Sequence, residues 1–220
     1  MREFQLLIFD WDGTLVDSVQ RIVDSMWFAA TECGLPLRSA ADVRGIIGLG
    51  LPEAIQTLYP DLSDAPTLAQ FRTAYSEHYL YLEREPSPLF AGVREALVSF
   101  REQGYQLAVA TGKSRRGLER VLDGQGLRAF FDVTRCADET ASKPNPLMLE
   151  EILAHCSASP AQSLMVGDSP FDVLMAHNAG VMPVAVSYGA QPLSVLQACQ
   201  PQLCIDHFSE LQDWLATRRR

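Results

Sequence analysis

The sequence lacks the cysteine patterns that stabilise small secreted proteins or bind zinc. Its five cysteines are an odd number, they are widely spaced, and no two of them form a Cys-x-x-Cys pair. Neither a disulfide framework nor a zinc site is therefore expected, and free thiols in a reducing compartment are the simplest interpretation. Internal repeats and low-complexity segments are absent as well.

Long apolar runs are also missing. No stretch approaches the roughly 18 apolar residues that a membrane helix requires. The apolar run near the N-terminus contains Asp10 and Asp12 at its end, so it does not resemble a signal peptide. We therefore expect a cytoplasmic protein without a membrane span.

Basic residues are fewer than acidic ones, with 18 lysines and arginines against 27 aspartates and glutamates. The net charge of −9 argues against binding of nucleic acid through general electrostatic attraction. The hydrophobic fraction of 47% and the charged fraction of 20% are typical of a soluble globular protein. A chain of 220 residues can form one core and a smaller second domain. Nothing in it requires assembly, so a monomer or a weak homo-oligomer is expected.

Short apolar segments alternate with segments of helical pattern after residue 88. Strands are predicted at 5–9, 105–110, near Val133, and at 163–166, 181–186 and 203–205. Helices are predicted at 92–103, 114–125, 146–155, 170–178 and 208–215. This alternation is typical of a Rossmann-like α/β core, a parallel sheet with helices on both faces.

The segment between the first strand and residue 88 is helical in pattern. Apolar residues recur at helical spacing up to Gly34, and Pro52 and Pro66 are placed to begin two further helices. An aromatic face on the last of these is interpreted as core packing. The predicted domains are an α/β core of residues 1–16 and 88–220 and an inserted helical domain of residues 17–87.

Four polar groups fall at the carboxyl ends of predicted strands or just before a helix. Parallel strands bring these ends to one edge of the sheet, where α/β proteins bind their ligands. We therefore expect the groups to form a single site. They are Asp10 with Asp12, Thr111 with its neighbours to Ser114, Lys143, and Asp168 with Asp172.

The residue types in this set point to chemistry on phosphate. Several carboxylates can hold a hard divalent cation, for which Mg²⁺ is well suited. A lysine and a hydroxyl beside a glycine backbone can hold phosphate oxygens. One carboxylate remains to attack phosphorus, and another can carry a proton to the leaving oxygen.

Two familiar motifs are excluded by their spacing. The sequence Gly112-Lys113-Ser114 would belong to a P-loop only if a glycine stood at position 107, where the chain has leucine. A calcium loop beginning at Asp10 would need a glutamate at position 21, where the chain has arginine.

The combination of motifs resembles the haloacid dehalogenase superfamily, in particular its phosphoglycolate-phosphatase-like branch. The segment 10–18, Asp-Trp-Asp-Gly-Thr-Leu-Val-Asp-Ser, is similar to the first motif of that family. Thr111 and Lys143 match the second and third motifs, and Asp168 and Asp172 match the fourth. The helical insert is similar to the cap domain of the family.

The resemblance implies catalytic roles for four residues. Asp10 would be the nucleophile that becomes an aspartyl phosphate, and Asp12 would be the general acid and base. Thr111 and Lys143 would hold the transferring phosphoryl group, and Lys143 would also offset the charge on Asp10.

The same resemblance implies a Mg²⁺ site. Its ligands would be the Asp10 carboxylate, the backbone carbonyl of Asp12 and the Asp168 carboxylate. Asp172 would support the site through water or through Lys143.

The leading hypothesis is therefore Mg²⁺-dependent hydrolysis of a small phosphorylated metabolite, with a phosphosugar mutase or a non-catalytic metabolite-binding module as alternatives. A dehalogenase is disfavoured because Asp12 is present. A phosphonate-cleaving enzyme is disfavoured because residues 17–87 contain no lysine. Phosphoglycolate, a sugar phosphate, a nucleotide and pyrophosphate are all compatible with the sequence. The roles of Lys113, Arg115, Arg116 and the glycine-rich loop at 44–51 stay open.

Overall fold

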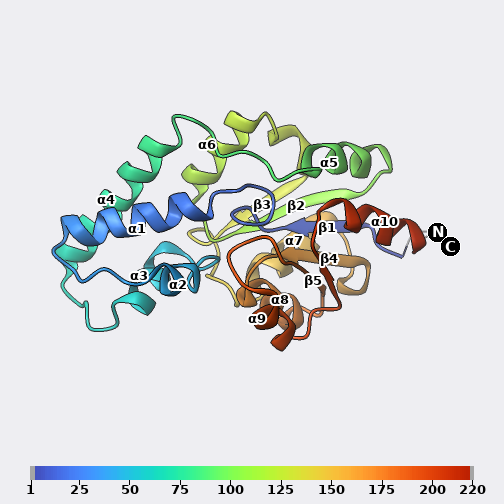
Figure 1. Cartoon of the computed structure of the whole chain (residues 1–220). Helices are drawn as coiled ribbons and strands as arrows, with labels where there is room; N and C mark the ends of the chain where they lie inside the picture. The colour runs from blue at the N-terminus through green and yellow to red at the C-terminus, as the bar shows by residue number, and fades with distance from the viewer. Residues whose placement is uncertain (1–2, 219–220) are drawn as a thin grey trace.

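The computed structural model describes residues 3–218, and within them the core of the molecule is one parallel sheet (Figure 1). Its six strands lie in the order β3-β2-β1-β4-β5-β6, and every neighbouring pair is parallel. The order reverses between β1 and β4, which places the topological switch point beside β1. The strands are β1 (Leu6–Phe9), β2 (Gln106–Thr111), β3 (Val133–Cys136), β4 (Ser163–Gly167), β5 (Met182–Val186) and β6 (Leu203–Ile205).

Alternating side chains of β1 pack against different layers of helices. Leu7 and Phe9 belong to a cluster formed with α5 (Val93–Glu102), α6 (Arg115–Gln125) and α10 (Ser209–Thr217). Leu6 and Ile8 belong to a second cluster, on the opposite face, formed with α7 (Leu147–Cys156) and α8 (Pro170–Asn178). A short helix, α9 (Leu193–Ala198), packs beside α8. The predicted fold class is confirmed, because the sheet is parallel and covered on both faces.

A separate group of helices lies beyond one end of the sheet (Figure 1), and we call it the α1–α4 unit. It has its own hydrophobic cluster, and α1 runs along α4. Pro52 and Pro66 stand in the first turns of α3 and α4, as the sequence predicted. Its helices are α1 (Val19–Glu32), α2 (Ala40–Arg44), α3 (Leu51–Leu58) and α4 (Ala65–Leu82).

Helix α9 was not predicted, and α2 was not predicted as a separate helix although it lies in the segment of helical pattern. They have six and five residues, too few for a helical period to emerge from the sequence. Helix α2 begins at a capping box, in which the Ser39 side chain accepts the Asp42 N–H and the Asp42 side chain accepts the Ser39 N–H.

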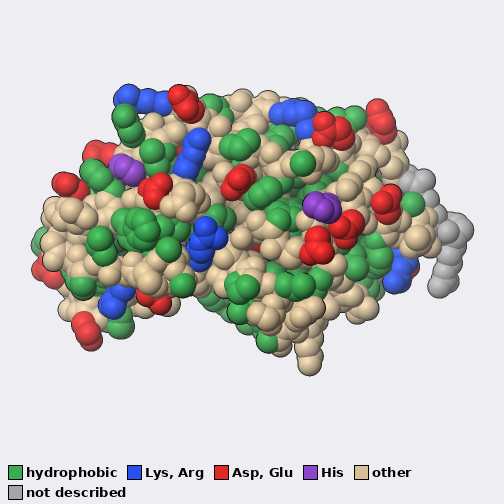
Figure 2. Space-filling model, viewed as in Figure 1, with side chains coloured by type: hydrophobic (Ala, Val, Ile, Leu, Met, Phe, Trp, Pro, Cys, Tyr) green, Lys and Arg blue, Asp and Glu red, His purple; other side chains and the backbone are tan. Residues whose placement is uncertain are grey.

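The surface carries charges of both signs. On the face shown in Figure 2, acidic and basic side chains are interspersed over the α1–α4 unit and the core. In the stretch from residue 3 to residue 218, no helix has the length and apolarity needed to cross a membrane.

Trp11, between the two first aspartates, belongs to the core. Its side chain is fully buried and meets Phe131 edge to face, with 6.5 Å between the ring centroids. It extends the cluster of Leu7 and Phe9 beyond the end of β1. Packing therefore explains an aromatic residue at this position.

Candidate active site

Three buried carboxylates converge at the switch point of the sheet. Asp10 directly follows β1, Asp168 directly follows β4, and Asp172 lies in the first turn of α8. One carboxylate oxygen from each lies within 4.8 Å of the others. Each residue is no more than 1% exposed. The fold thus brings together three acids that are up to 162 positions apart in the sequence numbering.

Lys143 neutralises part of this charge. Its Nζ lies 2.7 Å from Asp10 Oδ1 and 2.7 Å from Asp172 Oδ1, and its side chain has no exposed surface. Burial alone would lower the pKa of Lys143, but Asp10 and Asp172 outweigh it and raise that pKa. Burial raises the pKa of Asp10 to about 7, even though Lys143 acts in the opposite direction.

The other two carboxylates are held by hydrogen bonds. Asp168 accepts the backbone N–H of Ala190 at 2.6 Å, and burial, followed by the charge of Asp10, raises its pKa well above the usual value. Asp172 accepts from the Ser169 hydroxyl at 2.6 Å through the oxygen that does not contact Lys143. Both oxygens of Asp172 are therefore engaged by protein groups.

The donor set fits a hard divalent cation. Asp10 Oδ2 is buried and has no hydrogen-bond partner. The carboxylates of Asp168 and Asp172 lie beside Asp10. One lysine cannot balance three buried carboxylates, and a cation held by oxygen ligands would balance the rest. Residue 13 must be glycine here, because its φ is +78° and a Cβ would lie 2.0 Å from Asp168 Oδ2.

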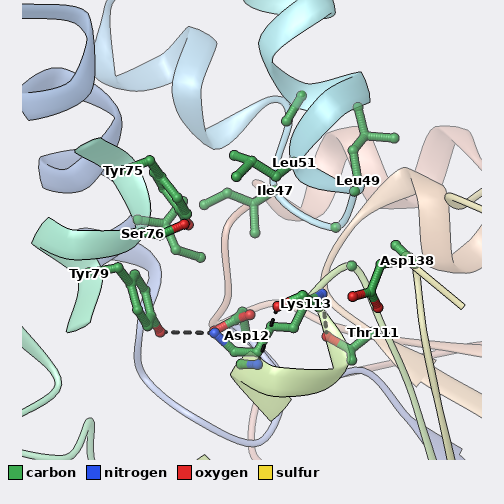
Figure 3. A pocket seen from close by; sticks show the side chains of 18 of the residues that line it. Asp12, Ile47, Leu49, Leu51, Tyr75, Ser76, Tyr79, Thr111, Lys113 and Asp138 are labelled. Atoms are coloured by element: carbon green, nitrogen blue, oxygen red, sulfur yellow. Dashed lines mark hydrogen bonds and ion pairs between the residues drawn. The ribbon is translucent and has the colours of Figure 1, made fainter. Parts of the chain in front are cut away.

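Asp12 lies apart from the three-carboxylate cluster. Its Oδ1 accepts from the Ser18 hydroxyl at 2.6 Å and lies 3.1 Å from Lys113 Nζ. Lys113 also donates to the Tyr79 hydroxyl at 3.0 Å, as Figure 3 shows, and its Nζ lies 4.3 Å from the centre of the Tyr79 ring. The two aspartates of the first motif therefore have different surroundings, one beside Lys143 and the other beside Lys113.

Lys113 and Tyr79 also belong to the site. The sequence left the role of Lys113 open, and it assigned the helix face that carries Tyr79 to core packing. Tyr79 comes from α4 in the α1–α4 unit, and Lys113 follows β2 of the core, so their contact joins the two parts of the chain. Burial would lower the pKa of Lys113, but Asp12 and the nearby tyrosines raise it well above its usual value. One signal could have identified Lys113: the chain has only two lysines, and the other is Lys143.

Thr111 was predicted as a site residue, and the roles of Arg115 and Arg116 were left open by the sequence. Thr111 ends β2, is fully buried, and lines the same cavity as Asp10 and Asp12. Arg115 turns away, because its guanidinium pairs with Glu139 at 2.6 Å. Arg116 lines the cavity from α6.

The glycine-rich loop between α2 and α3 rests on the core. The Gly50 N–H donates to the Ser142 hydroxyl at 2.9 Å, and Gln191 Nε2 donates to the Arg44 carbonyl at 2.6 Å. A Cβ at Gly112 would lie 2.4 Å from the Leu49 carbonyl oxygen, so a side chain there would push the loop away. These contacts leave a cavity of about 350 Å³ between the α1–α4 unit and the sheet edge.

The chain belongs to the haloacid dehalogenase-like hydrolase family, whose model matches residues 7–186. Two curated relatives match nearly the whole chain. The probable phosphatase IndB of Dickeya dadantii is 36% identical over 94% of this chain and 91% of that protein. A phosphoglycolate phosphatase of Vibrio cholerae is 33% identical over 96% of both chains.

A solved structure shows the same fold. The crystal structure of a predicted phosphoglycolate phosphatase from Haemophilus somnus superposes with a TM-score of 0.87 and 27% identity, covering 97% of this chain and 98% of that one. The family identified from the sequence is confirmed, and so is the enzyme class, a phosphoric monoester hydrolase.

Proposed function

We propose that this protein hydrolyses a small phosphorylated metabolite in the manner of a phosphoglycolate phosphatase, using Mg²⁺ and an aspartyl phosphate formed on Asp10. One observation carries the proposal. The unpartnered oxygen Asp10 Oδ2 lies within a cluster of three buried carboxylates, and Asp10 lines the cavity between the α1–α4 unit and the sheet edge. A buried carboxylate without a partner is costly, and its retention indicates a ligand or a reaction at that oxygen.

The residues divide the reaction into two steps. Asp10 attacks phosphorus, so that a bond from its carboxylate oxygen forms as the bond to the ester oxygen breaks. Asp12 gives its proton to that leaving oxygen. Asp12 then takes a proton from the water that attacks the aspartyl phosphate, and this releases phosphate and restores Asp10. Thr111 and Lys143 hold the phosphoryl oxygens during both steps.

The proposed Mg²⁺ would be held by the carboxylates of Asp10 and Asp168 and the backbone carbonyl of Asp12, with Asp172 in support. When bound, it would neutralise charge on the phosphoryl oxygens. The two carboxylate oxygens of Asp172 contact Lys143 and Ser169. These contacts favour an indirect role for Asp172 over direct ligation of the cation.

Residues 17–87 are proposed to act as a cap over the core of residues 1–16 and 88–220. The contacts of Gly50 with Ser142 and of Tyr79 with Lys113 support this role, since they join residues 17–87 to the core beside the cavity that Asp12 lines. A closed cap would exclude bulk water and limit the size of the substrate.

The test of the proposed function is phosphate release from a panel of phosphorylated metabolites. Turnover of at least one ester is expected with Mg²⁺, and none after the cation is removed with EDTA. The panel includes a sugar 1-phosphate, for which the mutase alternative predicts isomerisation without release of phosphate. If the protein binds members of the panel and turns over none of them, the non-catalytic alternative replaces this proposal.

Mg²⁺ is also expected to stabilise the folded protein, by more at pH 8 than at pH 6. Protons compete with the cation for Asp10, whose pKa is about 7, and for Asp168, whose pKa is raised well above the usual value. Raising the pH through 7 therefore removes protons from the site and enlarges the stability gained from Mg²⁺. That gain is about 2.7 kcal/mol when the concentration of free Mg²⁺ is 100 times its dissociation constant. The measurement is the unfolding temperature with and without MgCl₂ at matched ionic strength.

The Asp168→Asn variant is the control for this effect, because it removes one proposed ligand and keeps the shape of the side chain. Its gain from MgCl₂ should be much smaller. An equal gain at both pH values, or an undiminished gain in the variant, would contradict the assignment of the site.

A further inference from the structure

We propose that the substrate's leaving group is an uncharged alcohol with an apolar ring or a surface of similar size, in preference to a compact anion such as glycolate or phosphate. This inference rests on the proposed function and specifies its substrate class. It follows from the wall of the cavity that faces the phosphate-handling residues.

The α1–α4 unit presents an apolar wall to this cavity. Figure 3 shows Ile47, Leu49 and Leu51 on one side and Tyr75 and Tyr79 on the other, above Asp12, Lys113 and Thr111. Further apolar side chains of the α1–α4 unit line the cavity, among them Ile22, Met26 and Leu80. A leaving group attached to a phosphate held at Asp10 would extend into this space.

The cavity is also larger than a compact acidic leaving group requires. Pockets that enclose drug-sized ligands have volumes of roughly 300–1,000 Å³, and this cavity has about 350 Å³. A two-carbon leaving group would leave much of the apolar wall without contacts. A ring-bearing alcohol would cover it and remove that surface from water.

No cation faces the cavity from the α1–α4 unit. Among the described residues that line it, the only charged group from this unit is the carboxylate of Glu53. A carboxylate or phosphate on the leaving group would therefore lose water against a wall that offers it no cation, only the hydroxyls of Tyr75, Ser76 and Tyr79. An uncharged leaving group avoids this cost.

The basic groups on the core side do not change this conclusion. Lys113 already contacts the Asp12 carboxylate and the Tyr79 hydroxyl. Arg116 and Arg120 are exposed residues of α6, and the acidic Asp138 lines the same side of the cavity. If these arginines did select an anionic leaving group, anionic esters would be the better substrates, and the experiment below separates the two cases.

The experiment compares three esters of primary alcohols under the same conditions with Mg²⁺: benzyl phosphate, ethyl phosphate and 2-phosphoglycolate. All three require cleavage of a bond to an alkyl oxygen, so the comparison measures recognition of the leaving group. The kcat/KM for benzyl phosphate is expected to exceed that for 2-phosphoglycolate by ~10-fold or more, since even one methylene in an apolar pocket is worth roughly 10-fold to 200-fold.

A pair of variants locates the effect on the wall. Leu49→Ser removes apolar surface from the cavity and should lower kcat/KM for benzyl phosphate by ~10-fold while changing that for ethyl phosphate by less than ~2-fold. Leu37→Ser is the matched control, because Leu37 is 60% exposed and does not line the cavity. It should leave all three values unchanged.

Each outcome decides the inference. Preference for 2-phosphoglycolate, or equal turnover of benzyl phosphate and 2-phosphoglycolate by the unmodified protein, overturns it without affecting the proposed phosphatase activity. Equal losses for all esters in Leu49→Ser overturn the role of the wall. Failure to hydrolyse these esters and every metabolite of the panel overturns the proposed function, and this inference with it.

Discussion

The Asp10→Asn variant is expected to hydrolyse phosphate esters roughly 10⁴-fold more slowly than the unmodified protein, or slower still. An amide cannot form the aspartyl phosphate, and no other carboxylate is placed to replace it, since Asp168 and Asp172 are held by Ala190, Lys143 and Ser169. The measurement is kcat with Mg²⁺ on the best substrate of the panel.

The same variant should remain folded. Burial has raised the pKa of Asp10 to about 7, so above pH 7 the metal-free protein carries an unfavourable buried charge on Asp10, and this charge also raises the pKa of Asp168. Removing the charge of Asp10 relieves this cost, so the unfolding temperature in EDTA should stay equal or rise. A fall in activity with a retained unfolding temperature then reports chemistry and not misfolding.

The control for this variant is Asp17→Asn, which changes an exposed carboxylate of the same motif. It should keep both activity and stability. Acid-quenched protein should carry one phosphoryl group during turnover, and the Asp10→Asn protein should carry none. Undiminished phosphatase activity in Asp10→Asn would refute the covalent mechanism.

The Lys143→Met variant is expected to lose activity and also to lose about 3–5 kcal/mol of stability. Lys143 lies 2.7 Å from Asp10 and from Asp172, and its removal leaves two buried carboxylates without their cation. For a chain of this length such a loss corresponds to a fall of roughly 10 °C in the unfolding temperature. The measurement is the unfolding temperature in EDTA across a pH series.

The pH series gives the sign of this effect. Lys143 acts to lower the pKa of Asp10, so its removal would raise that pKa above the present value of about 7. A carboxyl group whose folded pKa exceeds its unfolded value of 3.8 costs stability as the pH rises above the unfolded value. The deficit of Lys143→Met should therefore be larger at pH 8 than at pH 5.

Arg135→Met is the matched control, because it also replaces a basic residue that contacts a carboxylate. Arg135 lies 2.6 Å from Glu151, but both side chains are partly exposed. The loss should stay below about 1 kcal/mol, as is usual for exposed ion pairs. If Lys143→Met were as stable as this control at pH 8, the buried charges of Asp10 and Asp172 could not both depend on Lys143.

Much of the core could be predicted from the sequence, because its strands and helices each leave a local periodic signal. The predicted strand at 105–110 is displaced by one residue from β2, Gln106–Thr111, and the predicted helix at 170–178 coincides with α8. The five-residue helix α2 was missed because its capping box spans one turn and leaves no repeating pattern.

The candidate site was predictable for the residues that follow strands. Asp10 and Thr111 stand at strand ends, and the parallel sheet brings such ends together whatever the side chains are. Tyr79 could not be assigned in this way. It lies on a helix face whose aromatic residues would look the same if all of them packed in a core, and only its contact with Lys113 distinguishes it.

By itself, the sequence determined the family and the parallel fold and predicted the residues of the candidate site, since strand periodicity and strand-end residues are local properties of the chain. Tertiary structure alone decided how the two aspartates of the first motif differ. It placed Asp10 beside Lys143 and Asp12 beside Lys113, and it set an apolar wall opposite them. The two ion pairs join residues more than 100 positions apart, and burial at those contacts fixes the charge of the site.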